Sequence, residues 1–205
     1  MLTSLSNKDA DIEAAAAEAL KDDALLANLL DGLSSREETY RYNCFKVLML
    51  ISREHGELLY PVWDRLAEQL GAANTYWRIS ALQLISNLTA VDAEHRFEKL
   101  FDRYFALLDD KSMIPAAQLA GASGRIVRAK PHLEARVTEK LLGIEATHHR
   151  PDRKDLIKAY AIESFDAYYE QAEDREKILD FVRRQLNSSS PKTRKLAQEF
   201  LRKRE

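Results

Sequence analysis

The apolar positions of residues 76–88 recur with the spacing of a helix. This stretch reads Tyr-Trp-Arg-Ile-Ser-Ala-Leu-Gln-Leu-Ile-Ser-Asn-Leu, and one helix face collects Ala81, Leu82, Ile85 and Leu88. An upstream apolar helix ends at Leu70, eight residues before Arg78. The same offset of eight residues recurs three times in the chain, at Leu33 and Arg41, Leu107 and Pro115, and Leu186 and Arg194. The pattern therefore predicts a repeated unit of two helices.

The equivalent positions of this unit are 41, 78, 115, 158 and 194, which lie 37, 37, 43 and 36 residues apart. Periods of this size are typical of helical solenoids. We therefore predict an all-α fold, a right-handed α-solenoid of about five antiparallel helix pairs that forms one domain over residues 1–205. Residues 1–21 are expected to be a leading helix or cap, and the repeats to fill residues 22–205.

Helix boundaries follow from the apolar stripes and the stop signals between them. Outer helices are predicted at 22–34, 58–70, 93–108, 131–144 and 175–186. Inner helices are predicted at 39–55, 75–89, 113–128, 155–169 and from 191 onward. Ser35 and Glu38 have the spacing of a capping box, and Ser190 followed by Pro191 predicts an N-cap. The irregular stretch 145–153 contains a six-residue insertion, and no proline is expected to interrupt a helix.

The inner helices align at four registers. The aligned sets are Arg41, Cys44, Phe45, Leu48; Arg78, Ala81, Leu82, Ile85; Pro115, Gln118, Leu119, Ala122; Lys158, Ala161, Ile162, Phe165; and Arg194, Ala197, Gln198, Leu201. This pattern resembles the HEAT repeat of the armadillo-type α-solenoids, whose second helix opens with an apolar-Arg pair, a small residue and then leucines. Residues 77–82 match it most closely, and the resemblance covers residues 22–205.

The resemblance carries an implication for the basic residues at the first register. In HEAT proteins this residue commonly pairs with acids of adjacent repeats, which predicts a ladder of ion pairs at Arg41, Arg78, Lys158 and Arg194. The alternative is that these cations face the phosphates of a ligand. Pro115 interrupts the series in the middle, which weighs against that alternative.

Charge and composition exclude several classes. The formal net charge is -2, so no global field attracts nucleic acid or anionic membrane. The single cysteine, Cys44, excludes an internal disulfide and is expected to be a small buried residue. The sequence contains no apolar run of about 20 residues and no signal-peptide pattern at its start. We therefore expect a cytoplasmic protein without membrane contact.

Motifs for common catalytic chemistry are absent. The chain contains no dinucleotide or phosphate loop, no His-Glu-x-x-His and no Gly-x-Ser-x-Gly, so we predict a non-enzymatic protein without cofactor or metal. His148 and His149 lack another histidine or cysteine at ligand spacing and are interpreted as part of a polar surface loop rather than a zinc site. The segment from Gly121 to Gly124 is expected to serve close helix packing.

A partner surface is predicted on the inner helices, opposite their buried stripe. In the third inner helix this face has only small residues, Ala117, Ala120 and Gly124, between larger ones on neighbouring helices. We expect a depression that binds a peptide or helix of another protein, formed by Asn43, Tyr76, Ser80, Gln83, Asn87, Ala117, Ala120, Tyr160 and Glu163. The same projection gives Leu196, Glu199 and Lys203 in the last helix.

Three alternatives stay open from the sequence. The small residues could instead serve tighter packing between repeats. The protein could bind nucleic acid, as do HEAT-like proteins of the alkylpurine DNA glycosylase type, although a nearly neutral face gives little phosphate affinity. The binding surface could also be the basic C-terminal end, which contains Lys192, Arg194, Lys195, Arg202, Lys203 and Arg204.

Overall fold

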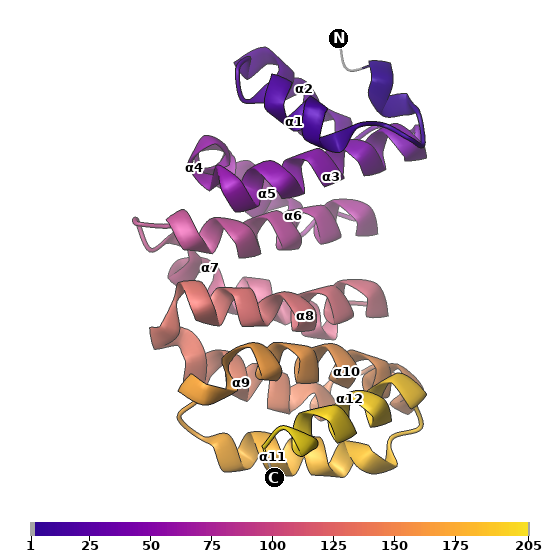
Figure 1. The fold of residues 1–205 in the computed structure, drawn as a ribbon, viewed down its shortest axis with the longest axis vertical. Coiled ribbons are helices and arrows are strands. Elements are labelled where there is room, and N and C mark those ends of the chain that lie inside the picture. The colour runs from indigo at the N-terminus through magenta and orange to yellow at the C-terminus, as the bar shows by residue number, and fades with distance from the viewer. Residues whose placement is uncertain (1–2, 205) are drawn as a thin grey trace. The chain divides into compact units, whose positions relative to one another are not determined.

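A computed structural model describes residues 3–204, and helices are the regular secondary structure throughout this range (Figure 1). The all-α prediction is therefore confirmed. The α-helices are α1 Ile12–Ala19, α2 Asp23–Gly32, α3 Glu38–Glu54, α4 Gly56–Leu59, α5 Trp63–Gln69, α6 Thr75–Leu88, α7 Arg96–Phe105, α8 Met113–Ala129, α9 Glu134–Leu142, α10 Pro151–Tyr168, α11 Arg175–Arg184 and α12 Pro191–Arg202. None of the helices within residues 3–204 is both long and apolar enough to cross a membrane.

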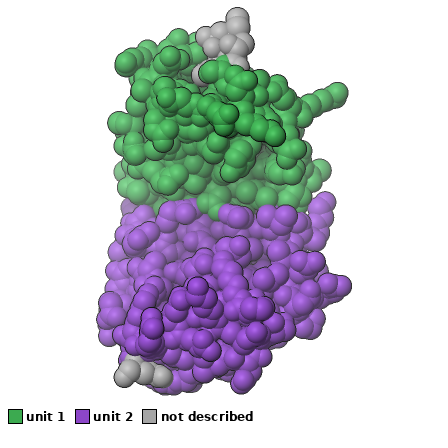
Figure 2. Space-filling model, turned by 45° about the vertical axis from the view of Figure 1, so that its right-hand side comes forward, with its two compact units in different colours: residues 1–93 green, residues 94–205 purple. Residues whose placement is uncertain are grey.

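The chain divides into two compact units, residues 1–93 and residues 94–205 (Figure 2). In the first unit, α3 packs against α1, α2 and α6, and α5 packs against α6. The buried apolar side chains of α3 and α6 lie between these helices, including Leu48, Ile51, Leu82 and Ile85. Cys44 on α3 is fully buried, as predicted. Residues 1 and 2 of the predicted leading segment lie outside the described range.

In the second unit, α8 packs along α10, and α10 packs along α12 (Figure 1). The helices α9 and α11 pack against each other, α9 also contacts α8 and α10, and α11 contacts α12. The core is rich in aromatic rings: Phe97 and Tyr104 on α7 meet edge to face with centroids 5.2 Å apart. Phe165 of α10 meets Phe181 of α11 at 5.5 Å in the same manner.

Most predicted helices are found, but the outer ones after α2 are interrupted or closed by 3-10 turns. The predicted helix 58–70 is divided into α4 and α5 by the 3-10 turn Tyr60–Val62. The expectation that no proline interrupts a helix is wrong here, because Pro61 has no N–H to continue the α-helical ladder. The predicted helix 131–144 likewise consists of the 3-10 turn Pro131–Leu133, then α9, then the start of the 3-10 turn Gly143–Ala146.

One of the two predicted caps is found. Ser190 is the N-cap of α12, where its side chain accepts a hydrogen bond from Thr193 N, and Pro191 follows it. The predicted capping box of Ser35 and Glu38 is not formed, because α3 begins at Glu38 and its N-cap is Glu37. Ser35 instead accepts a hydrogen bond from Glu37 N at 3.1 Å within the preceding turn.

The irregular stretch 145–153 is shorter than predicted. The 3-10 turn Gly143–Ala146 extends into it, and α10 begins at Pro151, four residues before the predicted start at 155, because proline suits the first turn of a helix. The interpretation of both histidines as exposed loop residues is wrong for His149, which is only 7% exposed. Its ring lies against the carbonyl oxygen of Leu108, with 3.1 Å between Nε2 and that oxygen.

The basic residues at the first register make two kinds of contact. Nη1 of Arg41, Arg78 and Arg194 lies 2.8, 2.6 and 2.6 Å from the carbonyl oxygen of the residue six positions earlier. Each of these arginines is three residues past the first residue of its helix, and the contacted carbonyl belongs to the preceding turn. Lys158 lies seven residues past the start of α10 and does form ion pairs, with Glu145 at 2.5 Å and Asp155 at 3.4 Å.

Candidate functional site

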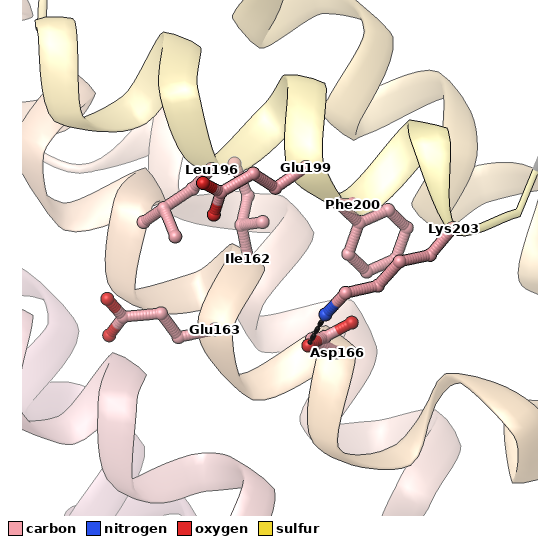
Figure 3. Close-up of a pocket in the computed structure, with 7 residues that line it drawn as sticks. All are labelled: Ile162, Glu163, Asp166, Leu196, Glu199, Phe200 and Lys203. Carbon is pink, nitrogen blue, oxygen red and sulfur yellow. Dashed lines mark hydrogen bonds and ion pairs between the residues drawn. The ribbon is translucent and has the colours of Figure 1, made fainter.

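A hollow of about 130 Å³ lies between α10 and α12 in the second unit (Figure 3). On α12 its lining residues follow the spacing i, i+3, i+4 and i+7, which places them on one helix face. The lining of the hollow consists of Ile162, Glu163 and Asp166 from α10 and of Leu196, Glu199, Phe200 and Lys203 from α12.

The hollow has an apolar floor and a charged rim. Ile162 and Phe200 are 1% and 2% exposed, and Leu196 is half-buried beside them. Glu163, Asp166 and Lys203 are exposed around this floor, and the close-up shows Lys203 extending from α12 toward Asp166 on α10. An apolar patch with polar groups at its edge is the arrangement that anchors a partner side chain at protein interfaces.

Asp166 is held by two cations from the end of α12. Lys203 Nζ donates to one carboxylate oxygen at 2.8 Å, and Arg204 Nη2 donates to the other at 2.7 Å. Burial alone would raise the pKa of Asp166, but these two hydrogen bonds outweigh it and lower the pKa below its ordinary value. The guanidinium of Arg204 also lies over the Phe200 ring, 3.7 Å from its centroid. This end of the hollow is therefore closed by a fixed charge cluster.

The other carboxylates of the rim have weaker partners. Glu163 pairs with Lys192 at 3.0 Å, and both side chains are more than two-fifths exposed. Glu199 pairs with Lys195 at 3.8 Å, close to the limit for an ion pair. Exposed pairs of this kind contribute about 0–1 kcal/mol each. A cation from a binding partner can therefore replace either lysine at little cost.

The size of the hollow restricts what it can bind. Sites for small molecules and cofactors are typically about 300–1,000 Å³, whereas this hollow measures about 130 Å³. A volume of that order accommodates one aliphatic side chain. The geometry therefore favours recognition of an extended or helical segment through a single anchor residue.

The structure places most of the partner residues predicted in the first unit inside the protein. Asn43, Ser80, Gln83 and Asn87 are all less than a tenth exposed. Asn43 Nδ2 donates to the carbonyl oxygens of Leu5 and Asn7 at 2.8 Å each, and Asn87 Nδ2 donates to Ser52 Oγ at 2.8 Å. These amide donors hold the chain's own segments together.

Tyr76 and Tyr160 are more accessible than these amides. Tyr76 is 56% exposed, and the guanidinium of Arg41 lies 4.6 Å from its ring centroid. Tyr160 is half-buried in the second unit, where Lys192 Nζ lies 3.7 Å above its ring. Lys192 thus contacts both Tyr160 and Glu163, so these two predicted residues share a neighbour beside the hollow.

The small residues of α8 are packed against α10. Ala117 and Ala120 are 4% and 0% exposed. A Cβ added to Gly124 would lie 3.0 Å from Ala167 Cβ and 3.2 Å from the carbonyl oxygen of Ser164. Gly124 N donates to Ser164 Oγ at 3.0 Å. The predicted role of the Gly121–Gly124 segment in close helix packing is therefore confirmed.

Of the nine predicted partner residues, Glu163 alone lines the hollow. Three of the lining residues on α12 could have been selected from the sequence, because the same projection of helix faces gives Leu196, Glu199 and Lys203. Ile162 and Phe200 could not be selected, because helical spacing identifies apolar residues as core without showing where neighbouring helices leave a gap.

No protein-family model matches the chain, and no curated protein matches it. The residues of the hollow and the repeated contacts of the helices are therefore the features that bear on function.

Proposed function

We propose that the chain is a helical-repeat scaffold of the HEAT type, a right-handed α-solenoid that binds a segment of another protein. The repeated arginine contact supports this proposal. Arg41, Arg78 and Arg194 are register-equivalent in the sequence, and each donates to the carbonyl six residues earlier. Units with the same local contact at the same register are the building blocks of repeat proteins, whose exposed helix faces commonly bind other proteins.

The hollow between α10 and α12 is the anchor point in this proposal. Its floor of Ile162, Leu196 and Phe200 offers apolar surface to one side chain of leucine or methionine size. Burying such a side chain contributes about 1.5–3 kcal/mol, which is the scale of a binding hot spot. The apolar hollow between α10 and α12 is the one observation on which the proposed binding of a partner segment rests.

The charged residues at the rim indicate which charge the partner segment has. Three carboxylates and one ammonium line the hollow, Glu163, Asp166 and Glu199 against Lys203. Glu163 and Glu199 have exposed, weak pairs that a partner's cation can replace. The partner segment therefore presents one apolar residue flanked by Lys or Arg.

The same charges favour a protein over nucleic acid. Affinity for DNA comes largely from lysines and arginines that neutralise phosphates. At this surface the cations Lys192, Lys203 and Arg204 are already paired with carboxylates, and the carboxylates would repel phosphate. Plain duplex DNA is therefore expected to bind weakly, and tight salt-sensitive binding of DNA would favour the alternative function.

A peptide selection tests the proposal. Random peptides displayed on phage are selected against the chain and counter-selected against Leu196→Trp, whose ring fills the hollow. The expected result is a set of peptides, retained only by the unsubstituted chain, with one aliphatic residue flanked by Lys or Arg. A thermal melt of the variant verifies its fold. Peptides that bind both proteins equally, or that lack this pattern, would refute the anchor.

A further inference from the structure

Asp109, His148 and His149 come together in the second unit, although 39 residues separate Asp109 from His148 in the sequence. Asp109 ends the 3-10 turn Ala106–Asp109, and the two histidines lie between the 3-10 turn Gly143–Ala146 and α10. Asp109 Oδ1 accepts a hydrogen bond from His148 N at 2.7 Å and lies 2.6 Å from His148 Nδ1. The carboxylate therefore contacts both the backbone and the ring of the first histidine.

The His149 ring is buried and held in one orientation. Its Nε2 lies 3.1 Å from the carbonyl oxygen of Leu108, and its ring centroid lies 4.5 Å from that of His148. A carbonyl oxygen only accepts hydrogen bonds, so Nε2 carries the hydrogen and Nδ1 of the neutral ring has a free lone pair. Histidines that bind metals commonly donate their other ring N–H to a carbonyl or carboxylate in this way.

The three side chains have the spacing of a ligand set. One ring nitrogen of each histidine and a carboxylate oxygen of Asp109 lie within 4.8 Å of one another. Zinc bonds of about 2.0–2.2 Å place tetrahedral ligands about 3.4 Å apart. His148 Nδ1 and Asp109 Oδ1 are 2.6 Å apart and must separate if both bind the ion, whereas any pair near 4.8 Å must come closer. Asp109 and His148 can rotate inward, because their side chains are 56% and 52% exposed.

We propose that Asp109, His148 and His149 bind a divalent transition-metal ion of the Zn²⁺ type. Two imidazoles and one carboxylate suit zinc and its neighbours, whereas Mg²⁺ and Ca²⁺ prefer oxygen ligands. Three protein ligands leave a fourth position of a tetrahedral ion for water or another molecule. The site does not depend on the proposed partner surface.

A second histidine cluster provides an internal control. His95 and His132 lie 3.0 and 2.9 Å from Glu98 Oε1, so this cluster also has two imidazoles and a carboxylate. Here the Lys130 ammonium donates to both oxygens of Glu98, at 3.0 and 3.1 Å. A fixed cation on the carboxylate repels a metal ion, so this cluster is expected not to bind one.

The test is calorimetric titration of the full chain, without a polyhistidine tag and after treatment with a chelator, with Zn²⁺, Mg²⁺ and Ca²⁺. The expected result is one Zn²⁺ per chain and no binding of Mg²⁺ or Ca²⁺. Asp109→Asn and His148→Ala each weaken Zn²⁺ binding by about tenfold or more, while His132→Ala leaves it unchanged. Both informative variants change exposed side chains, and Asn at 109 can still accept the hydrogen bond from His148 N.

Three results would overturn the proposal. These are no heat of Zn²⁺ binding, the same affinity in Asp109→Asn and His148→Ala as in the unsubstituted chain, and an equal loss in His132→Ala. Circular dichroism of each variant confirms its helix content. A rise in melting temperature with Zn²⁺ that disappears in Asp109→Asn provides a second readout, because a ligand that binds only the folded state stabilises it.

Discussion

Nη1 of Arg78 lies 2.6 Å from the carbonyl oxygen of Ala72, six residues earlier and in the turn before α6. Arg41 and Arg194 make the same contact at the start of α3 and α12. Turn carbonyls near a helix start have no partner in the helical ladder, and a guanidinium offers several donors in a fixed plane. The periodic arginine in the sequence therefore has a local structural role, which is to fix the turn between paired helices.

Replacing Arg78 by methionine tests this role. The side chain is 4% exposed, and its loss leaves the carbonyl oxygens of Ala72 and Ala73 without these donors. We expect a loss of about 1–3 kcal/mol in the free energy of unfolding, measured by urea titration. The matched control is Arg53→Met. Arg53 also donates to a backbone carbonyl, but it is exposed, so a loss below about 0.5 kcal/mol is expected. Equal losses in the two variants would contradict this role.

The fold could be predicted largely because helical periodicity and capping are local signals. The predicted helix 75–89 and the observed α6 differ by one residue. The 3-10 turn at Pro61 and the identity of the carboxylates that pair with Lys158 could not be predicted in the same way. Proline at that position is compatible with either a helix start or an interruption, and the Lys158 contacts depend on where α10 begins.

Gly124 tests the close packing of α8 against α10. Alanine at this position would bring a methyl group to 3.0 Å from Ala167 Cβ and 3.2 Å from a backbone oxygen of α10, which cannot move aside freely. We expect Gly124→Ala to destabilise the chain by about 1–3 kcal/mol through overpacking. Gly143→Ala is the control, because a Cβ there meets nothing within 4 Å. A neutral effect at Gly124 would show that the two helices can separate at no cost.

The Glu98 cluster predicts a specific loss of stability in acid. Burial alone would raise the pKa of Glu98, but hydrogen bonds from His95, Lys130 and His132 lower it from 4.5 to about 2. A carboxylate with a lowered pKa stabilises the folded state above pH 4.5, and this contribution is lost as the pH falls toward 2. Its size is at most about 3 kcal/mol, less after solvent screening.

Unfolding by urea between pH 2 and pH 6 measures this contribution. The unsubstituted chain should lose more stability than Glu98→Gln as the pH falls from 4.5 to 2, because the glutamine cannot bind the additional proton. At pH 6 the variant should be the less stable of the two proteins. Parallel curves over the acid range would show that the ion pairs of Glu98 do not contribute to folding.

The candidate site was harder to predict than the fold because it depends on gaps between helices. Helix projection selected Ala120 as part of an open depression, yet its side chain is fully buried. Small residues allow either a depression or a close approach, and the sequence of one helix does not distinguish these outcomes. The Asp109 cluster shows the same difficulty, since its carboxylate and imidazoles lie on segments 39 residues apart.

A charge swap at Glu199 tests whether the hollow between α10 and α12 anchors a partner segment that combines an apolar residue with Lys or Arg. Fluorescence anisotropy gives the Kd of a selected peptide for the unsubstituted chain, for Glu199→Lys and for the control Glu176→Lys on α11. We expect an affinity about tenfold weaker for Glu199→Lys, restored when a flanking Lys of the peptide becomes Glu, and unchanged for the control. Equal affinity of one peptide for all three proteins would contradict it.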